Sequence, residues 1–154
     1  MTDSARPPRD GFRFAHRLRV RWPEVDMQQV VFFGHYYAYF DLGMTEYLRH
    51  LGMAYPDGLL DAETDLFMAH SECDYRASAL YDDELDIWTR VGRVGRSSLH
   101  FEFEICRDDT LLVSGRLVYV FANPQTRQSR AVPEAFRARV EAFESGRADV
   151  LQGG

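Results

Sequence analysis

The hydrophobic residues of this chain repeat with two different periods, and the order of these periods limits what the chain can fold into. Its second half carries three long strand patterns, at 84–94, 98–107 and 111–122. The dipeptides Gly95-Arg96 and Asp108-Asp109 separate them, and strands joined by such short turns pair as antiparallel neighbours. The side chains expected to face the core are Leu85, Ile87, Thr89 and Val91 in the first strand and Leu99, Phe101, Phe103 and Ile105 in the second. These segments predict one antiparallel sheet.

One long helix is predicted before these strands. Five residues recur at helical spacings of three or four positions: Tyr36, Phe40, Gly43, Tyr47 and Leu51. The helix is expected from about His35 to Leu51, with Gly52 as its C-cap. A Gly inside a helix costs about 1 kcal/mol relative to Ala. Gly43 on the apolar face therefore predicts close packing of the helix backbone against a flat surface such as a sheet.

The remaining patterns complete an α+β arrangement. Near the N-terminus, alternate residues are expected to share one face of a strand: Phe12, Phe14, His16, Leu18 and Val20. A shorter strand pattern covers 67–75, and Pro133 followed by Glu134 opens a short helix that ends near Phe143. The predicted order is strand, long helix, four strands, short helix, which gives one five-stranded antiparallel sheet against one long helix. The domain is expected over 12–146, with loose tails at 1–11 and 147–154.

The composition excludes several classes of function. The net charge of −6 argues against nucleic acids and anionic membranes as partners. The longest uncharged stretch, 27–40, is shorter than the roughly 20 apolar residues of a membrane span, and no apolar secretory signal is recognisable, so a cytoplasmic protein is expected. All 18 basic residues are Arg, which excludes chemistry based on Lys. The two Cys and five His residues lack metal-binding spacings, so we predict neither a metal nor another cofactor.

Asp26 is the carboxylate with the most informative surroundings. It lies between the first strand and the long helix, among mostly apolar residues. A loop Asp commonly caps a turn by accepting hydrogen bonds from backbone N–H groups. The catalytic alternative is that free N–H groups at the helix N-terminus hold an oxyanion while the carboxylate attacks a carbonyl group or activates a water. The spacing of the residues alone favours the turn-capping role of Asp26.

A longer pattern strengthens the catalytic alternative. Between Arg17 and Leu51 an Asp is followed by two aliphatic residues, two aromatic residues, a small residue and a helix: Asp26, Val30, Val31, Phe32, Phe33 and Gly34. This stretch resembles the acyl-CoA thioesterases of the hotdog fold, in the branch related to 4-hydroxybenzoyl-CoA thioesterase. The resemblance extends from about Arg17 to Pro133, with a supporting match at 83–99. It implies a sheet wrapped around the long helix, and hydrolysis of an acyl-CoA thioester to the free acid and CoA.

The resemblance also implies roles for individual residues. Asp26 would be the nucleophile or general base, and the backbone amides of Phe33 and Gly34 would form the oxyanion hole. The side chains expected to line the acyl pocket are Phe32, Phe33, His35 and Tyr36. The family places its site between two subunits, so a homodimer or homotetramer is implied. Both faces of the last strand are apolar from Leu117 onward, which agrees with a central or interface position.

Two other groups of residues are candidate parts of the site. Arg93 and Arg96, beside Ser97 and Ser98, are the candidates for binding CoA phosphates, because Arg can bind phosphate oxygens through two parallel hydrogen bonds. A solvated hairpin end is the ordinary interpretation of such a cluster. Glu46 on the helix is a second candidate carboxylate. Its spacing to Arg49 and His50 favours a surface ion pair instead.

One departure from the family pattern keeps a second function open. The family usually has Gly at the position of Gln29, where the loop bends. This change motivates the alternative of a non-catalytic acyl-CoA-binding module with the same fold. Retention of Asp26 argues against it, because a binder has no need of an anion beside a carbonyl group. A hydratase is a third, less favoured interpretation, because His35 falls within the helix and is separated from Asp26 by an apolar run.

Overall fold

A computed structural model describes residues 9–56, 58 and 61–146. Its elements are β1 (Phe14–Arg19), the short 3-10 helix η1 (Trp22–Glu24), α1 (His35–His50), β2 (Asp65–Tyr75), β3 (Glu84–Val94), β4 (Ser98–Arg107), β5 (Thr110–Ala122) and α2 (Glu134–Glu144). The five strands form one antiparallel sheet in the order β1-β3-β4-β5-β2. Strand β4 is therefore central, β5 is interior, and β1 and β2 are the edges.

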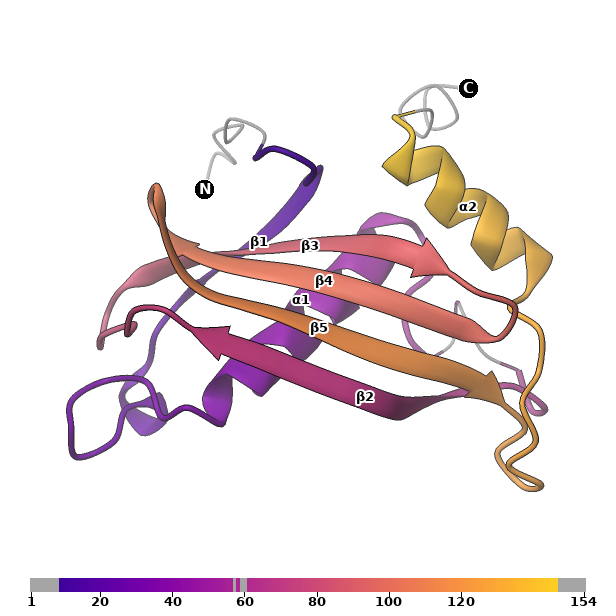
Figure 1. Ribbon diagram of the computed structural model, residues 1–154, viewed down its shortest axis with the longest axis horizontal. Helices are drawn as coiled ribbons and strands as arrows, with labels where there is room; N and C mark the ends of the chain where they lie inside the picture. Colours follow the sequence, from indigo (N-terminus) through magenta and orange to yellow (C-terminus); the bar gives the residue numbers. More distant parts are fainter. Residues whose placement is uncertain (1–8, 57, 59–60, 147–154) are drawn as a thin grey trace.

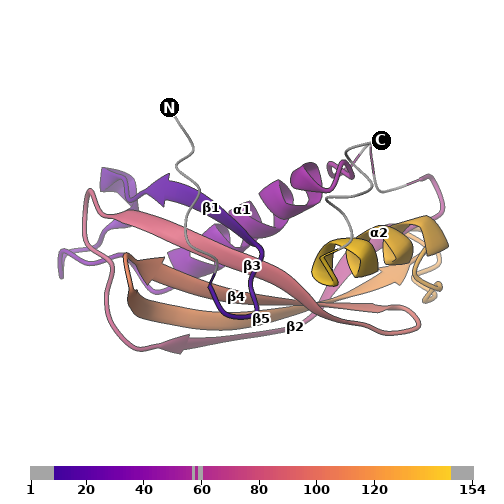
Figure 2. The same ribbon diagram turned by 90° about the horizontal axis from the view of Figure 1, so that it is seen from above.

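The sheet curves around α1, as Figures 1 and 2 show. Helix α1 crosses one face of the sheet, and α2 packs on the same side near the end of β3. Within the described part of the chain, the opposite face of the sheet carries no helix. This arrangement confirms the predicted α+β hotdog fold. None of the described helices is both long and apolar enough to cross a membrane.

The predicted faces of the strands and the helix are confirmed by burial. All eight side chains expected to point inward from β3 and β4 are buried, as are the five residues of the helical repeat. Gly43 explains how closely α1 lies on the sheet. A Cβ atom at Gly43 would come within 2.6 Å of Thr89 Oγ1 and 2.8 Å of Ile87 Cγ2. Only a residue without a side chain therefore allows this approach.

Phe12 departs from the predicted strand. The strand begins at Phe14, and the backbone turns at Gly11, whose φ is 80°, while Arg9 and Phe12 form an isolated bridge. This turn places Phe12 on the outer face of the sheet against Trp88 instead of with Phe14 in the main core. The prediction that Phe12 shares the inner face is therefore wrong. The expected loose tails are 1–11 and 147–154, of which residues 1–8 and 147–154 lie outside the described residues.

The carboxylate of Glu144 connects α2 to helix α1 and to the sheet. Its Oε1 atom accepts a hydrogen bond from the Tyr47 hydroxyl of α1 at 2.6 Å and one from the Val91 N–H of β3 at 3.1 Å. Burial raises the pKa of Glu144 above its ordinary value, although these two donors and the charge of Arg90 act in the opposite direction. Glu144 is thus a half-buried acid whose ionisation is coupled to folding.

We expect Glu144→Gln to remove part of the pH dependence of stability. A raised pKa means that the folded chain holds this proton more tightly than the unfolded chain, so this stabilisation is complete below pH 4.5 and is lost as pH rises through the raised value. Gln keeps the acceptor oxygen but does not ionise. Urea unfolding of both proteins between about pH 4 and pH 8 should show the wild type losing stability relative to the variant. Parallel curves would contradict this assignment.

Candidate active site

A tight turn fixes the carboxylate of Asp26. The Asp26 N–H donates to the Val30 carbonyl at 3.0 Å, and the Gln29 N–H donates to the Asp26 carbonyl at 2.9 Å. Oδ1 of Asp26 accepts the Gln28 N–H at 2.8 Å, so the turn-capping role expected of a loop Asp is confirmed for this oxygen. The other oxygen, Oδ2, has no hydrogen-bond partner among the described residues. One oxygen therefore orients the carboxylate and leaves the other available.

Gln29 adopts a left-handed backbone conformation, which Gly takes more readily than other residues. Its φ is 68°, in the left-handed region. A turn closed by an i to i+3 hydrogen bond and followed by a left-handed residue is a common three-residue hairpin loop, and Gly is preferred at the left-handed position. The loop therefore bends sharply at Gln29, although a residue with a side chain occupies the bend.

We expect Gln29→Gly to stabilise the protein slightly. The left-handed conformation costs a residue with a Cβ atom about 1 kcal/mol or more. The greater conformational freedom of Gly in the unfolded chain offsets about 0.5–1 kcal/mol of this gain. Gln28→Gly is the matched control because the φ of Gln28 is not positive, and it should destabilise instead. Urea unfolding distinguishes the two variants, and equal losses of stability would contradict strain at Gln29.

The N-terminus of α1 presents backbone N–H groups without a side-chain cap. Its N-cap residue is Gly34, which has no side chain with which to accept these hydrogen bonds. Among the described residues, the N–H groups of Phe33 and Gly34 have no hydrogen-bond partner. Uncapped N–H groups and the positive end of the helix dipole favour a bound negative charge. The helix start can therefore hold an oxyanion.

A surface cavity of about 280 Å³ brings the turn and the helix start together. Its lining residues come from three segments: Asp26, Gln28, Val30, Val31, Phe33, Tyr36, Tyr75, Arg76, Ala77 and Ser78. Of the predicted site residues, Asp26, Phe33 and Tyr36 thus meet in one cavity. Phe32, Gly34 and His35 are close by in sequence, but they are not among its lining residues. The ring of Phe32 packs against that of Phe33, with centroids 4.6 Å apart.

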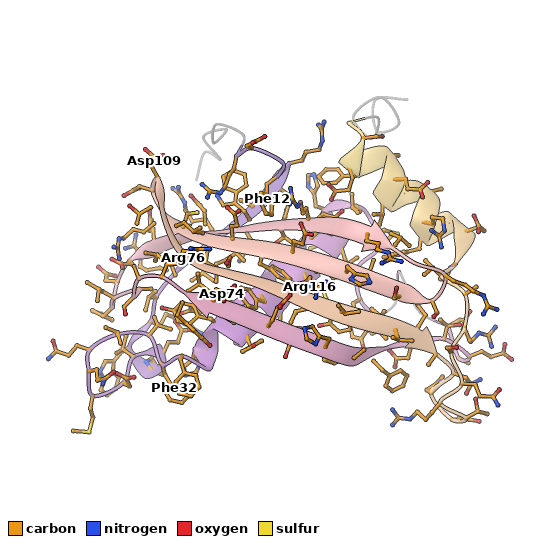
Figure 3. All side chains as sticks on the ribbon, viewed as in Figure 1. Phe12, Phe32, Asp74, Arg76, Asp109 and Arg116 are labelled. Atoms are coloured by element: carbon orange, nitrogen blue, oxygen red, sulfur yellow. The ribbon has the colours of Figure 1, made fainter. Side chains whose placement is uncertain are left out.

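The segment 75–78 forms one wall of this cavity, is followed by Ala79, and was missed by the sequence analysis. Ala79 accepts a hydrogen bond from the Val31 N–H at 2.9 Å and donates its own N–H to the Tyr36 hydroxyl at 3.1 Å. Burial raises the pKa of Tyr36 above its ordinary value. Arg76 follows β2 at the same end of the molecule as Phe32 (Figure 3). The only signal in the sequence was the end of a strand pattern at Tyr75.

Arg93, Arg96, Ser97 and Ser98 lie at the opposite end of the sheet. Ser98 pairs with Val120, whereas Tyr75 beside the cavity pairs with Val113. These two positions on β5 are seven residues apart, which corresponds to roughly 24 Å along a strand. Figure 1 shows the β3–β4 turn beside α2, far from the loop that precedes α1. Within one chain, this cluster therefore does not meet Asp26.

Other candidate groups have ordinary structural roles. Glu46 pairs with Arg49 at 3.4 Å, which confirms the predicted surface ion pair. Cys73 and Cys106 are both free thiols. The described residues include no group of three or more His, Cys, Asp or Glu side chains that could hold a metal ion.

Comparison with known proteins agrees with this fold. Residues 28–114, more than half of the chain, match the model of the Thioesterase superfamily. Acyl-CoA thioester hydrolase YbgC of Escherichia coli is 30% identical over 127 residues, which cover 81% of this chain and 93% of that protein. Acyl-CoA thioesterase YbgC of Haemophilus influenzae is 31% identical over 111 residues, covering 72% and 79% respectively.

A solved structure extends the comparison to the fold. The crystal structure of a protein from Aquifex aeolicus superposes with a TM-score of 0.77, at 20% sequence identity. The match covers 83% of this chain and 99% of that one. At this identity the likeness shows the shared fold alone.

Proposed function

This chain belongs to the thioesterase superfamily, and we propose that it hydrolyses an acyl-CoA thioester to the free acid and CoA, with Asp26 as its catalytic carboxylate. The observation that carries the proposal is the shared cavity of Asp26 and Phe33. An oriented carboxylate and uncapped helix amides are the two elements that acyl transfer from a thioester needs. The E. coli and H. influenzae relatives are named as acyl-CoA thioesterases, which supports CoA as the thiol.

The reaction would begin with the thioester carbonyl at the start of α1. Attack on the carbonyl carbon moves an electron pair onto its oxygen, and the N–H groups of Phe33 and Gly34 would stabilise the resulting oxyanion. Asp26 would act in one of two ways. As a nucleophile it forms an anhydride that water then hydrolyses; as a general base it takes a proton from the attacking water. In both cases the C–S bond breaks, the CoA thiolate leaves and is protonated, and one water is consumed.

The acyl group would enter through an aromatic region. Phe33 is 63% exposed and Phe32 is 43% exposed, and their rings pack together, so they form a contiguous exposed apolar surface. We propose that Phe32, Phe33, His35 and Tyr36 contact the acyl group around the helix start. These side chains suit an aryl or a medium aliphatic acyl chain, because both bury apolar surface against aromatic rings.

A second copy of the chain would complete the site. Strand β2 is a sheet edge of 11 residues, and its outer side has no partner strand in the described chain. Long unpaired edges are ready to pair with another strand. We propose a homodimer or homotetramer in which a neighbouring copy supplies Arg93, Arg96, Ser97 and Ser98 to the CoA phosphates. This arrangement would overcome the separation of these residues from Asp26 within one chain.

Release of free thiol from a panel of aryl-CoA and short to long alkyl-CoA esters tests the proposed function. We expect turnover of at least one ester, and the preferred acyl group would identify the substrate class. Binding of these esters without turnover would instead support the non-catalytic acyl-CoA-binding alternative. The left-handed conformation of Gln29 weakens that alternative, because the loop keeps its bend without glycine.

A further inference from the structure

Tyr75 makes a hydrogen bond to the backbone at the start of α1. It is the last residue of β2, and its hydroxyl donates to the Phe33 carbonyl at 3.1 Å. The two residues are 42 positions apart in the sequence. Phe33 begins the turn that leads into the helix. This bond therefore connects the sheet edge to the peptide that leads into α1.

The ring of Tyr75 reinforces this contact. It packs edge-on against Phe33, with centroids 6.5 Å apart, and against Tyr36, with centroids 5.6 Å apart. Burial and the neighbouring Cys73 thiol raise the pKa of Tyr75 above its ordinary value. The same side chain lines the cavity that contains Asp26.

Peptide geometry links this bond to the proposed oxyanion hole. In a trans peptide the carbonyl of one residue and the N–H of the next point in opposite directions within one plane. A donor that fixes the Phe33 carbonyl therefore also fixes the direction of the Gly34 N–H. The preceding peptide is held separately, because the His35 N–H donates to the Phe32 carbonyl at 2.9 Å. Both peptides that flank Phe33 are thus fixed through their carbonyl oxygens.

We infer that Tyr75 is a positioning residue: its hydroxyl and ring hold Phe33 and the Phe33–Gly34 peptide so that the helix-start amides face the thioester oxyanion. The inference rests on the proposed function, since it assigns a task to the same cavity. Tyr75 itself would not touch the reacting atoms. Its effect would appear in the transition state, where negative charge develops on the oxygen, and much less in the binding of substrate.

Tyr75→Phe tests this inference because it removes the hydroxyl and keeps the ring. A net hydrogen bond contributes about 1 kcal/mol, so we expect kcat for the preferred thioester to fall roughly fivefold. The affinity for a CoA thioether, which lacks the thioester carbonyl group, should stay within about twofold of the wild type. Tyr47→Phe is the control, because it also removes a tyrosine hydroxyl that makes a hydrogen bond. Tyr47 lies near the C-terminal end of α1 and donates to Glu144 of α2, so its loss should lower stability without lowering kcat.

Each outcome has a distinct meaning. A kcat within about twofold of the wild type in Tyr75→Phe would overturn the positioning role and leave the proposed function intact. An equal fall of kcat in Tyr47→Phe would also overturn it, since general loss of stability would then explain both variants. If the wild type releases no thiol, the proposed function fails instead. The amide resonance of Gly34 in ligand-free protein still reports on Tyr75: it should shift in Tyr75→Phe, and an unchanged resonance would overturn the contact.

Discussion

Asp26→Asn is expected to lower kcat for thioester hydrolysis by at least about a hundredfold, the usual scale for loss of an acid–base or nucleophilic group. Asn has almost the same shape as Asp, and its side-chain oxygen can still accept the Gln28 N–H that Oδ1 accepts in the wild type. The turn should therefore persist. What disappears is the negative charge of the oxygen that has no partner, and with it the capacity to attack a carbonyl carbon or to take a proton from water.

The measurement is thiol release under saturating substrate, with CoA thioether binding as a check that the site remains formed. Glu46→Gln is the matched control, because it removes a carboxylate charge from α1 where the structure shows only a surface ion pair with Arg49. Its kcat should stay close to that of the wild type. Turnover that survives in Asp26→Asn and is lost in Glu46→Gln would transfer the chemistry to the helix carboxylate.

Gly43→Ala is expected to lower the free energy of unfolding by about 1–3 kcal/mol, the usual cost of adding a methyl group to a packed interior. In an isolated helix the same change would be favourable by about 1 kcal/mol. The sign reverses here because the new Cβ atom would lie 2.6 Å from Thr89 Oγ1 and 2.8 Å from Ile87 Cγ2. Both neighbours are fully buried and β-branched, so they have little freedom to rotate away.

Asp41→Ala is the control for helix propensity, because Asp41 lies on the exposed side of the same helix. Urea unfolding should place it within about 0.5 kcal/mol of the wild type. A Gly43→Ala protein as stable as the wild type would show that α1 can move away from β3 at no cost. The close contact would then not be needed for the fold.

The regular elements were predictable because their signals are local. A period of two in the strands and a period near 3.6 in the helix decide which side chains can share a face, whatever lies opposite. The limits of β3 and β4 agree with the predicted ranges, and the short turns between them define their pairing. Phe12 was misplaced because the alternation of apolar and polar residues begins at Phe12, directly after the turn at Gly11, whereas the strand itself begins only at Phe14.

The candidate site was only partly predictable. Asp26 and the helix start are separated by a few residues, so one continuous stretch of sequence contained both, and the resemblance to hotdog thioesterases gave them roles that remain proposals. Sequence analysis missed the wall of the cavity formed by residues 75–78, because the hydrogen bonds that Tyr75 and the adjoining Ala79 make join segments about 40 residues apart. A local sequence pattern gives no information about contacts between residues so far apart in the sequence.

The sequence by itself determined the elements, their buried faces and the turn that orients Asp26, because each of these depends on side chains within a few positions of one another. Only the tertiary structure decided what meets at the helix start. The strand order β1-β3-β4-β5-β2 makes β2 an edge and brings Tyr75 to Phe33. Arg93 and Arg96 lie at the far end of the sheet because they are at the turn between β3 and β4, and the length of the strands sets that separation.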